Sequence, residues 1–132
     1  MLKYKELNVN PKKRKTGDCS TRAIVTCLGV DYDTALELQF KAAKEKYYDP
    51  SSRRVMESVL AKYGYFKRPQ PRKANGLKYP VYQMDSVLTE EEKKNGVVLN
   101  VANHYVAVKG DEYVDSWDSG LKYVGNYYSK RG

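Results

Sequence analysis

The hydrophobic pattern of this chain changes once along its length, at Gly96. Before Gly96, apolar side chains recur at the three- and four-residue spacing of helices that bury one face. After it, the stretch VVLNVANHYVAVKGDEYVDSW (97–117) is rich in valine and aromatic residues and is broken by Gly110-Asp111, a two-residue hairpin signal. Helices followed by an antiparallel sheet are typical of the α+β class. At 132 residues, the chain is long enough to bury a core of its own.

The part of the chain before Gly96 predicts three helices, over 19–28, 31–48 and 49–64. The residues expected on their buried faces are Ala23, Ile24, Cys27 and Leu28 in the first helix, Leu36, Phe40 and Ala43 in the second, and Val55, Val59 and Leu60 in the third. The expected capping residues are Asp18 or Thr16, Asp33, and Ser51 or Ser52, with Gly29 and Gly64 ending the first and third helices.

Shorter elements are expected around these helices and the hairpin. They are a strand over 65–68, a proline-rich loop over 69–80, a helical turn and an exposed charged stretch over 81–96, and one more strand over 121–128. Residues 1–16 are polar and basic and contain Pro11, so we expect them to form an extended arm. The rest of the chain, 17–132, is then expected to form a single domain.

The chain is basic, with 24 Lys and Arg against 16 Asp and Glu and a formal net charge of +8. Such a charge favours an acidic partner: nucleic acid, an acidic protein surface or anionic lipid. The basic residues gather at 11–15 and 67–73, and several of the 13 tyrosines lie beside lysine or arginine. This interleaving is typical of stacking surfaces for single strands. The simpler interpretation is that the tyrosines complete a small core while the lysines keep it soluble.

Several classes of protein are not expected. The chain has no run of about 18 apolar residues, so we expect no membrane span. Its first ten residues lack the apolar centre of a secretory signal, and two cysteines do not make a disulfide framework, so reduced thiols and a cytoplasmic location are expected. One histidine and two cysteines show no metal-ligand spacing, so neither a metal nor another cofactor is expected.

The sequence GDCSTRAIVTC (17–27) places Cys19 in the first turn of a predicted helix. The free N–H groups and the dipole of a helix N-terminus favour a thiolate there. A cysteine nucleophile also needs a base, and the one histidine, His104, stands at the start of the first strand of the predicted hairpin. Cys27, which lies with Ile24 and Leu28, is expected to be a core residue.

The hairpin register selects an acidic partner for His104. If Gly110-Asp111 forms a two-residue turn, His104 lies opposite Trp117, and Asp115 shares its face as a diagonal neighbour about 7–8 Å away. A loop one residue longer would bring Asp118 there instead. Glycine at the first turn position favours the shorter loop. We therefore predict that Cys19 attacks, His104 transfers the proton and Asp115 orients the imidazole, with Asp118 as the alternative.

The order of Cys19, His104 and Asp115, with the helix before the sheet, resembles the papain-like cysteine peptidase superfamily. DSW (115–117) is similar to the Asn-Ser-Trp tripeptide of papain-type enzymes, and NHYVAV (103–108) resembles the histidine strand of bacteriocin-processing peptidases. This resemblance implies a papain-like fold, with Asp115 in the orienting role of the asparagine and Trp117 shielding the contact. Four stretches, NPKKRKTGDCSTRAI, QPRKANG, NHYVAV and VDSWDS…VGNYY, also resemble small uncharacterised proteins of bacteriophages and Gram-positive bacteria.

The sequence departs from the papain pattern in two places. Papain-type enzymes carry a glutamine that binds the oxyanion about six residues before the cysteine, and here that position is Lys13. Asn8 or Asn10, together with the backbone N–H of Cys19, is expected to replace it. The aromatic or glycine-rich residues that surround the cysteine of the family are also missing from GDCST.

The predicted function is that of a cysteine-dependent amide hydrolase: a peptidase, an isopeptidase or a deamidase. Its expected substrate is a polypeptide, with an acidic host protein suited to the basic charge, and a phage-encoded protein would act in the host cytoplasm. The alternative is a catalytically inactive binding protein of the same fold. Its basic surface, rich in tyrosine and lysine, would hold nucleic acid or an acidic host protein.

Overall fold

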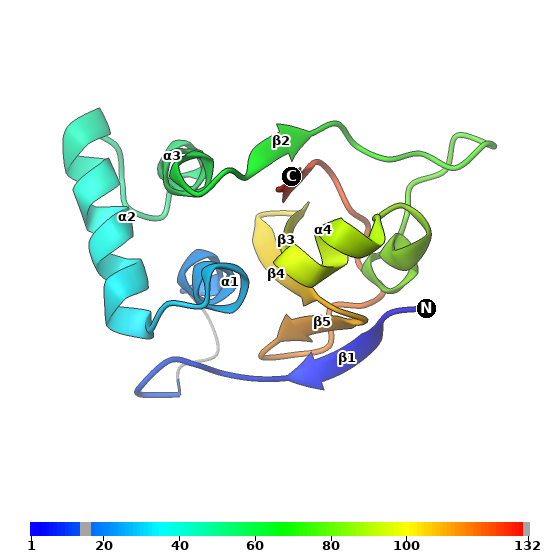
Figure 1. Ribbon diagram of the computed structural model, residues 1–132, viewed down its shortest axis with the longest axis horizontal. Helices are drawn as coiled ribbons and strands as arrows, with labels where there is room; N and C mark the ends of the chain where they lie inside the picture. Colours follow the sequence, from blue (N-terminus) through cyan, green and yellow to red (C-terminus); the bar gives the residue numbers. More distant parts are fainter. Residues whose placement is uncertain (14–16, 131–132) are drawn as a thin grey trace.

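The computed structural model describes residues 1–13 and 17–130 as a six-stranded sheet with helices against it (Figure 1). The helices are α1 (Cys19–Leu28), α2 (Tyr32–Lys46), α3 (Arg53–Lys62), the 3-10 helix η1 (Val81–Ser86) and α4 (Glu90–Asn95). The strands are β1 (Lys3–Glu6), β2 (Phe66–Arg68), β3 (Val97–Val101), β4 (His104–Lys109), β5 (Glu112–Asp115) and β6 (Tyr127–Ser129). The predicted α+β class is confirmed.

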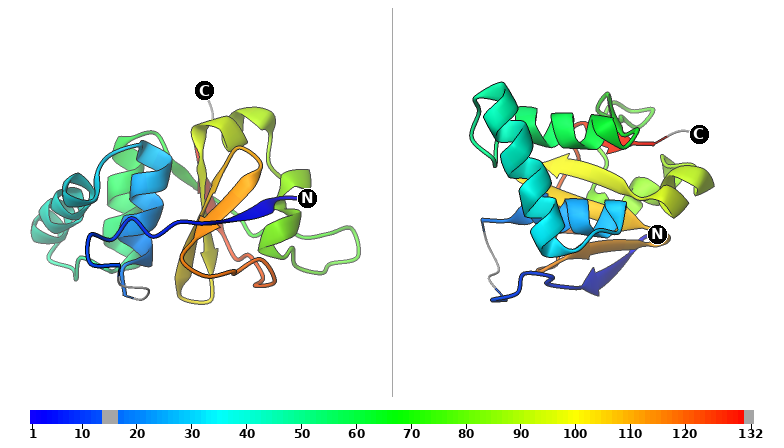
Figure 2. Two further views of the ribbon diagram at one scale, coloured as in Figure 1. Left: turned by 90° about the horizontal axis from the view of Figure 1, so that it is seen from below. Right: turned by 60° about the vertical axis from the view of Figure 1, so that its left-hand side comes forward.

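The sheet has the strand order β1-β5-β4-β3-β6-β2 and is buried on both faces. Helices α1, α2 and α3 lie on one side of it, and η1 and the 69–80 loop lie on the other (Figure 2). Alternate residues of each strand enter the two cores, because successive side chains of a strand point to opposite faces. Val98, Ala107 and Tyr128 meet the three helices, whereas Val97, Leu99, Val106, Val108 and Tyr127 form the second core.

Helix α1 has the bounds that the sequence predicts, and it ends as predicted at Gly29, which has φ 69° and donates its N–H to the carbonyl of Val25. In α3, the Ser52 hydroxyl accepts from the N–H of Val55 at 3.3 Å, so Ser52 is the cap of the predicted pair. Of the two residues proposed to cap α1, Asp18 occupies the N-cap position, and Thr16 lies outside the described residues.

Helix α2 differs from the prediction in its cap and its buried face. Asp31, not Asp33, caps it by accepting from the N–H of Thr34 at 2.7 Å. Phe40, which was expected inside, is 58% exposed. The buried residues of α2 are Ala35, Gln39, Ala42 and Ala43. This face is smaller and more polar than the predicted one, and its small side chains let α2 pack closely on its neighbours.

The predicted hairpin at Gly110-Asp111 is present, and its register is the shorter of the two considered: Lys109 pairs with Glu112. A second hairpin joins β3 to β4 through Ala102 and Asn103, with φ values of 37° and 66°. Two residues with positive φ suit the twist of a two-residue hairpin turn. This turn, which was not predicted, makes His104 the first residue of β4.

Residues 1–6 are not part of a separate arm. Lys3–Glu6 pair in parallel with Glu112–Asp115, so the sheet is mixed and not purely antiparallel as predicted. Leu2 is buried in the second core, which supplies apolar contact for this edge strand. Residues 14–16 of the proposed arm lie outside the described residues. The last strand is also shorter than predicted: β6 covers Tyr127–Ser129, whereas the sequence predicted a strand over 121–128.

Candidate active site

Cys19 is the first residue of α1, and this end of the helix lies against β4. Asp18 occupies the N-cap position but makes no capping hydrogen bond with its side chain. The side chain of the cap residue therefore does not close off the N–H groups of the first turn, and Cys19 and Ser20 of this turn line an opening. The thiol is half-buried, which leaves it accessible from this side.

His104 lies between Cys19 and Asp115, as the sequence predicts. Its Nε2 donates to Oδ2 of Asp115 at 2.7 Å, and it is also hydrogen-bonded to the thiol of Cys19. Because Nε2 is engaged by the carboxylate, Nδ1 is the ring nitrogen left for the thiol. The ring of Trp117 lies over the imidazole, with centroids 5.0 Å apart and an angle of 33° between the planes.

The carboxylate of Asp115 is buried and held from several sides. Besides His104, its oxygens accept from the N–H of Ser116 at 2.7 Å and from the hydroxyl of Ser119 at 2.8 Å. Asp118, the alternative partner of the histidine, accepts instead from the hydroxyl of Tyr113 and the N–H of Gly120. The observed register therefore brings Asp115, and not Asp118, to His104.

The electrostatics of the pair favour a thiolate and an imidazolium. Burial acts most strongly on Cys19 and raises the pKa of its thiol, but hydrogen bonds from His104 and the Tyr105 N–H, with the charges of His104 and Arg22, lower that pKa overall below 9.0. Burial lowers the pKa of His104, but its hydrogen bonds to Asp115 and Cys19 outweigh burial and raise it to about 9. An activated cysteine nucleophile has this arrangement.

Arg22 is a member of the site that sequence reasoning missed. Its Nε lies 2.9 Å from Oδ1 of Asp18, and its Nη1 lies 3.4 Å from Oδ1 of Asp115. Its side chain is only 8% exposed, so the two carboxylates hold a buried guanidinium. A signal was present in the sequence, because Arg22 is the one charged residue of the segment 19–28 and follows Asp18 by four residues.

Neither asparagine proposed for the oxyanion lines the opening at Cys19. The amide of Asn10 is buried and donates to Oδ2 of Asp18 at 2.7 Å and to the hydroxyl of Tyr32 at 3.1 Å. Asn8 accepts from the N–H of Asn10 with its side-chain oxygen. Lys13, at the position of the expected glutamine, donates to the carbonyl of Asn8. The asparagines therefore fix the chain before α1, and the prediction of an oxyanion donor on this segment is not met.

The opening at Cys19 has a volume of about 430 Å³ and lies between α1, the turn before β4 and the segment after Asp115. Its lining includes Asn103, His104 and Trp117 as well as Gly17, Ser20 and Ser51. Ser20 is held by Gln39 of α2, whose Nε2 donates to the Ser20 hydroxyl at 2.9 Å. This part of the lining is thus fixed by a contact between α1 and α2.

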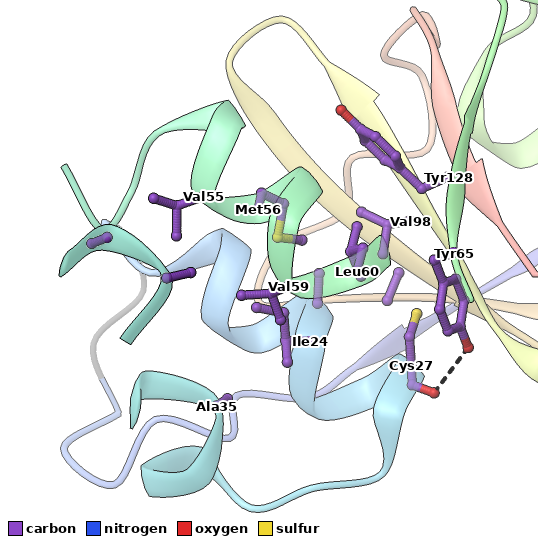
Figure 3. Close-up of a cluster of buried hydrophobic side chains, with 14 residues drawn as sticks. Ile24, Cys27, Ala35, Val55, Met56, Val59, Leu60, Tyr65, Val98 and Tyr128 are labelled. Atoms are coloured by element: carbon purple, nitrogen blue, oxygen red, sulfur yellow. Dashed lines mark hydrogen bonds between the residues drawn. The ribbon is translucent and has the colours of Figure 1, made fainter. Parts of the chain in front are cut away.

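Cys27 lies in the core, as predicted (Figure 3). Its Sγ donates to the carbonyl of Val97 at 3.4 Å, and its own carbonyl accepts from the hydroxyl of Tyr65 at 3.3 Å. Burial raises the pKa of the Cys27 thiol to about 12, against a smaller opposing effect of Lys109. The two cysteines of the chain thus have opposite environments.

Within residues 1–13 and 17–130, no group of three or more His, Cys, Asp or Glu side chains is arranged to hold a metal ion. Among the helices of this described part, none has the length and apolar character needed to cross a membrane.

No protein-family model, curated protein or solved structure matches the chain. What the site can do follows from its own geometry.

Proposed function

We propose that the protein is a cysteine-dependent amide hydrolase that uses Cys19, His104 and Asp115. The observation that carries this proposal is the position of the His104 imidazole, hydrogen-bonded to the Cys19 thiol on one side and to the buried Asp115 carboxylate on the other. A thiol, an imidazole and a carboxylate in this order form the constellation that activates a cysteine for acyl transfer.

The reaction has two halves. The Cys19 thiolate adds to the amide carbonyl, and the carbon–nitrogen bond breaks as the His104 imidazolium donates its proton to the leaving amine. A thioester on Cys19 remains. His104, now neutral, takes a proton from a water molecule that attacks the thioester, and this step releases the acid and restores the thiolate and imidazolium. Asp115 stabilises the imidazolium in both halves through the hydrogen bond to Nε2.

The oxyanion in each half requires donors near Cys19. The first-turn N–H groups of α1 are suited to this role, because Asp18 does not cap them and the helix dipole is positive at this end. The backbone N–H of Cys19 is one of these donors, whereas the side chains of Asn8 and Asn10 bond within the segment before α1 and to Asp18 and Tyr32. Trp117, stacked on His104, limits the access of water to the hydrogen bond with Asp115.

The resemblance to papain-like peptidases and to small phage proteins supports a papain-like fold and a phage origin, with action in the host cytoplasm. The opening of about 430 Å³ at Cys19 is large enough for a few atoms of backbone and one side chain of a polypeptide. The net charge of +8 suits an acidic polypeptide substrate, because opposite charge speeds the encounter. We therefore propose a peptidase, isopeptidase or deamidase that acts on an acidic host protein.

The test is a pooled library of peptides and of glutamine- and asparagine-rich proteins, incubated with the wild type and with Cys19→Ala and analysed by mass spectrometry. Cleaved or deamidated products that form with the wild type and are absent with Cys19→Ala support the proposal. A parallel incubation with peptidyl electrophiles measures covalent labelling of Cys19. If neither product nor labelled Cys19 is found while the protein is folded, the proposal is wrong and the alternative of an inactive binding protein is preferred.

A further inference from the structure

The proposed hydrolase site leaves the basic 69–80 loop unused. This loop follows β2 and extends on the side of the sheet away from α1, α2 and α3 (Figures 1 and 2). It belongs to the stretch in which the sequence gathers lysine, arginine and proline. It lies on the side of the sheet away from α1, which carries Cys19, and is therefore a separate surface.

The tip of the loop is an ordered turn. Arg72 and Lys78 form an antiparallel bridge across it, and the N–H of Lys73 donates to the carbonyl of Leu77 at 2.8 Å. Nη1 of Arg72 donates to the carbonyl of Gly76 at 3.1 Å, which fixes the guanidinium along the turn. A surface built this way loses little conformational entropy when a ligand binds.

The base of the loop is tied to the segment between β5 and β6. Pro80 and Tyr123 form a second antiparallel bridge. The N–H of Val124 donates to the carbonyl of Tyr79 at 2.8 Å, and the side chain of Gln70 donates to the carbonyl of Val124 at 3.0 Å. These bonds hold Tyr123 beside the basic turn, although the two are distant in sequence.

A groove of about 450 Å³ lies between the turn and this base. Arg72, Lys73 and Lys78 line it, as do Tyr82 and Tyr123. None of its lining residues is acidic. The size falls within the usual range for ligand sites in proteins.

The cations of this groove have no acidic partner in the part of the chain that the structure describes, since none of the ion pairs found there involves Arg72, Lys73 or Lys78. Lys73 lies instead over the ring of Tyr79, 5.6 Å from its centroid. Tyr123 is 61% exposed. Positive charges without carboxylates, beside an exposed aromatic face, are the two components of a site for single strands.

We infer that this groove, defined by Arg72, Lys73, Lys78, Tyr82 and Tyr123, binds single-stranded nucleic acid. The three cations contact phosphates, and a base stacks on the ring of Tyr123. An acidic polypeptide would use the cations as well, but only its occasional aromatic side chains could stack on the exposed ring, whereas every nucleotide carries a base that can do so. The aromatic component therefore favours the nucleic acid over the polypeptide. Binding at this groove does not require Cys19.

The experiment measures the fluorescence anisotropy of a labelled 20-nucleotide oligothymidine, with full-length protein at 50 and 200 mM salt. Three phosphate contacts predict a slope of about −2 for log K against log salt, or about 20-fold weaker binding at the higher salt. The double variant Lys73→Gln/Lys78→Gln is expected to bind at least tenfold more weakly at 50 mM salt, with a slope near −0.7. Tyr123→Ala is expected to lose at least about fivefold.

The matched control is Lys41→Gln/Lys44→Gln, which removes two exposed lysines from α2 on the opposite side of the sheet. It should bind within twofold of the wild type, and so should Cys19→Ala. Circular dichroism melting confirms that each variant is folded.

Equal binding by the wild type, the groove double variant and Tyr123→Ala would overturn the inference, as would undetectable binding at 50 mM salt. Tighter binding of a labelled 20-residue polyglutamate, lost in the groove double variant, would also overturn it and assign the groove to an acidic polypeptide.

Discussion

Oδ2 of Asp115 lies 2.7 Å from Nε2 of His104, so the end of β5 fixes the orientation of the first residue of β4. The contact engages one ring nitrogen and leaves the other for Cys19 at the start of α1. Three segments that are far apart in sequence therefore meet at one imidazole. The reactivity of Cys19 should depend on every member of this chain of contacts.

The first prediction concerns the two cysteines. Iodoacetamide reacts with thiolates, so Cys19, whose pKa is lowered, should be alkylated at least about tenfold faster than Cys27 near pH 7. Burial, which raises the pKa of Cys27 to about 12, also shields it from the reagent. Mass spectrometry of peptides taken at successive times measures both rates in one sample. Equal rates in the folded protein would contradict the proposed nucleophile.

The second prediction compares two aspartates that lie three residues apart. Asp115→Asn removes the charge that faces His104, so the imidazolium loses stabilisation and the alkylation rate of Cys19 at pH 7 should fall severalfold. In a working hydrolase, the same change is expected to lower kcat as well, because the imidazolium that protonates the leaving amine is less stabilised. Asp118→Asn is the matched control, because Asp118 contacts Tyr113 and Gly120 instead.

The control separates the role of Asp115 from a general effect of removing a carboxylate. Alkylation of Cys19 in Asp118→Asn should proceed at the wild-type rate. If Asp118→Asn slows Cys19 as much as Asp115→Asn does, the assignment of the third member to Asp115 is wrong. Urea denaturation of both variants checks that the folded state is populated during the measurement.

The third prediction concerns the buried ion pairs of Arg22. Arg22→Met leaves the buried carboxylates of Asp18 and Asp115 without their guanidinium, so we expect a loss of about 3–5 kcal/mol in the free energy of unfolding. Lys62→Met, which breaks the exposed pair with Glu45, should cost about 0–1 kcal/mol. Urea denaturation monitored by circular dichroism measures both.

A second variant separates charge from geometry at this position. Arg22→Lys keeps the charge but cannot reach both carboxylates with a planar fork, so its stability should lie between those of the wild type and Arg22→Met. A stability of Arg22→Met within 1 kcal/mol of the wild type would show that the buried pairs are not structural.

The sequence predicts the parts of this fold that local signals determine. The bounds of α1 follow from its apolar spacing and Gly29, and the partner of His104 follows from the Gly110-Asp111 turn. Those two local features are enough to bring Asp115, and not Asp118, to the imidazole. This is why the geometry of the site was more predictable than the full fold.

Features set by contacts between distant segments were not predicted. The pairing of β1 with β5 is parallel and joins segments that are far apart in the sequence, so no turn residue indicates it. Phe40 lies on the exposed face of α2 because Gln39 is the residue drawn inside, by hydrogen bonds to Ser20 and Thr21. Arg22 of α1 is buried between Asp18 and Asp115, and Asp115 arrives from a strand that is distant in sequence. Tertiary partners override the helical pattern at these positions.

The last prediction is a dependence of stability on pH. In Cys19→Ala, His104 keeps its hydrogen bond to Asp115, so its pKa in the folded protein stays above the ordinary 6.5. The folded protein then binds more protons than the unfolded chain above pH 6.5, and its stability falls as the pH rises. In the wild type, the Cys19 thiol helps to raise the pKa of His104 to about 9. Without the thiol this pKa is lower, so the decrease in stability of the variant is complete below pH 9.

In the wild type, the thiol opposes this fall. The lowered pKa of Cys19 contributes stability that is present above its ordinary 9.0 and is lost as the pH decreases, which is the opposite sign over the same window. The wild-type curve should therefore be flatter than that of Cys19→Ala between pH 6.5 and 9. Urea midpoints at pH 6, 7, 8 and 9 measure the two slopes, and Cys19→Ala/His104→Gln should lack the fall altogether. If the single and double variants have the same slope, His104 does not bind its proton more tightly in the folded state, and the imidazolium of the proposed mechanism has no support.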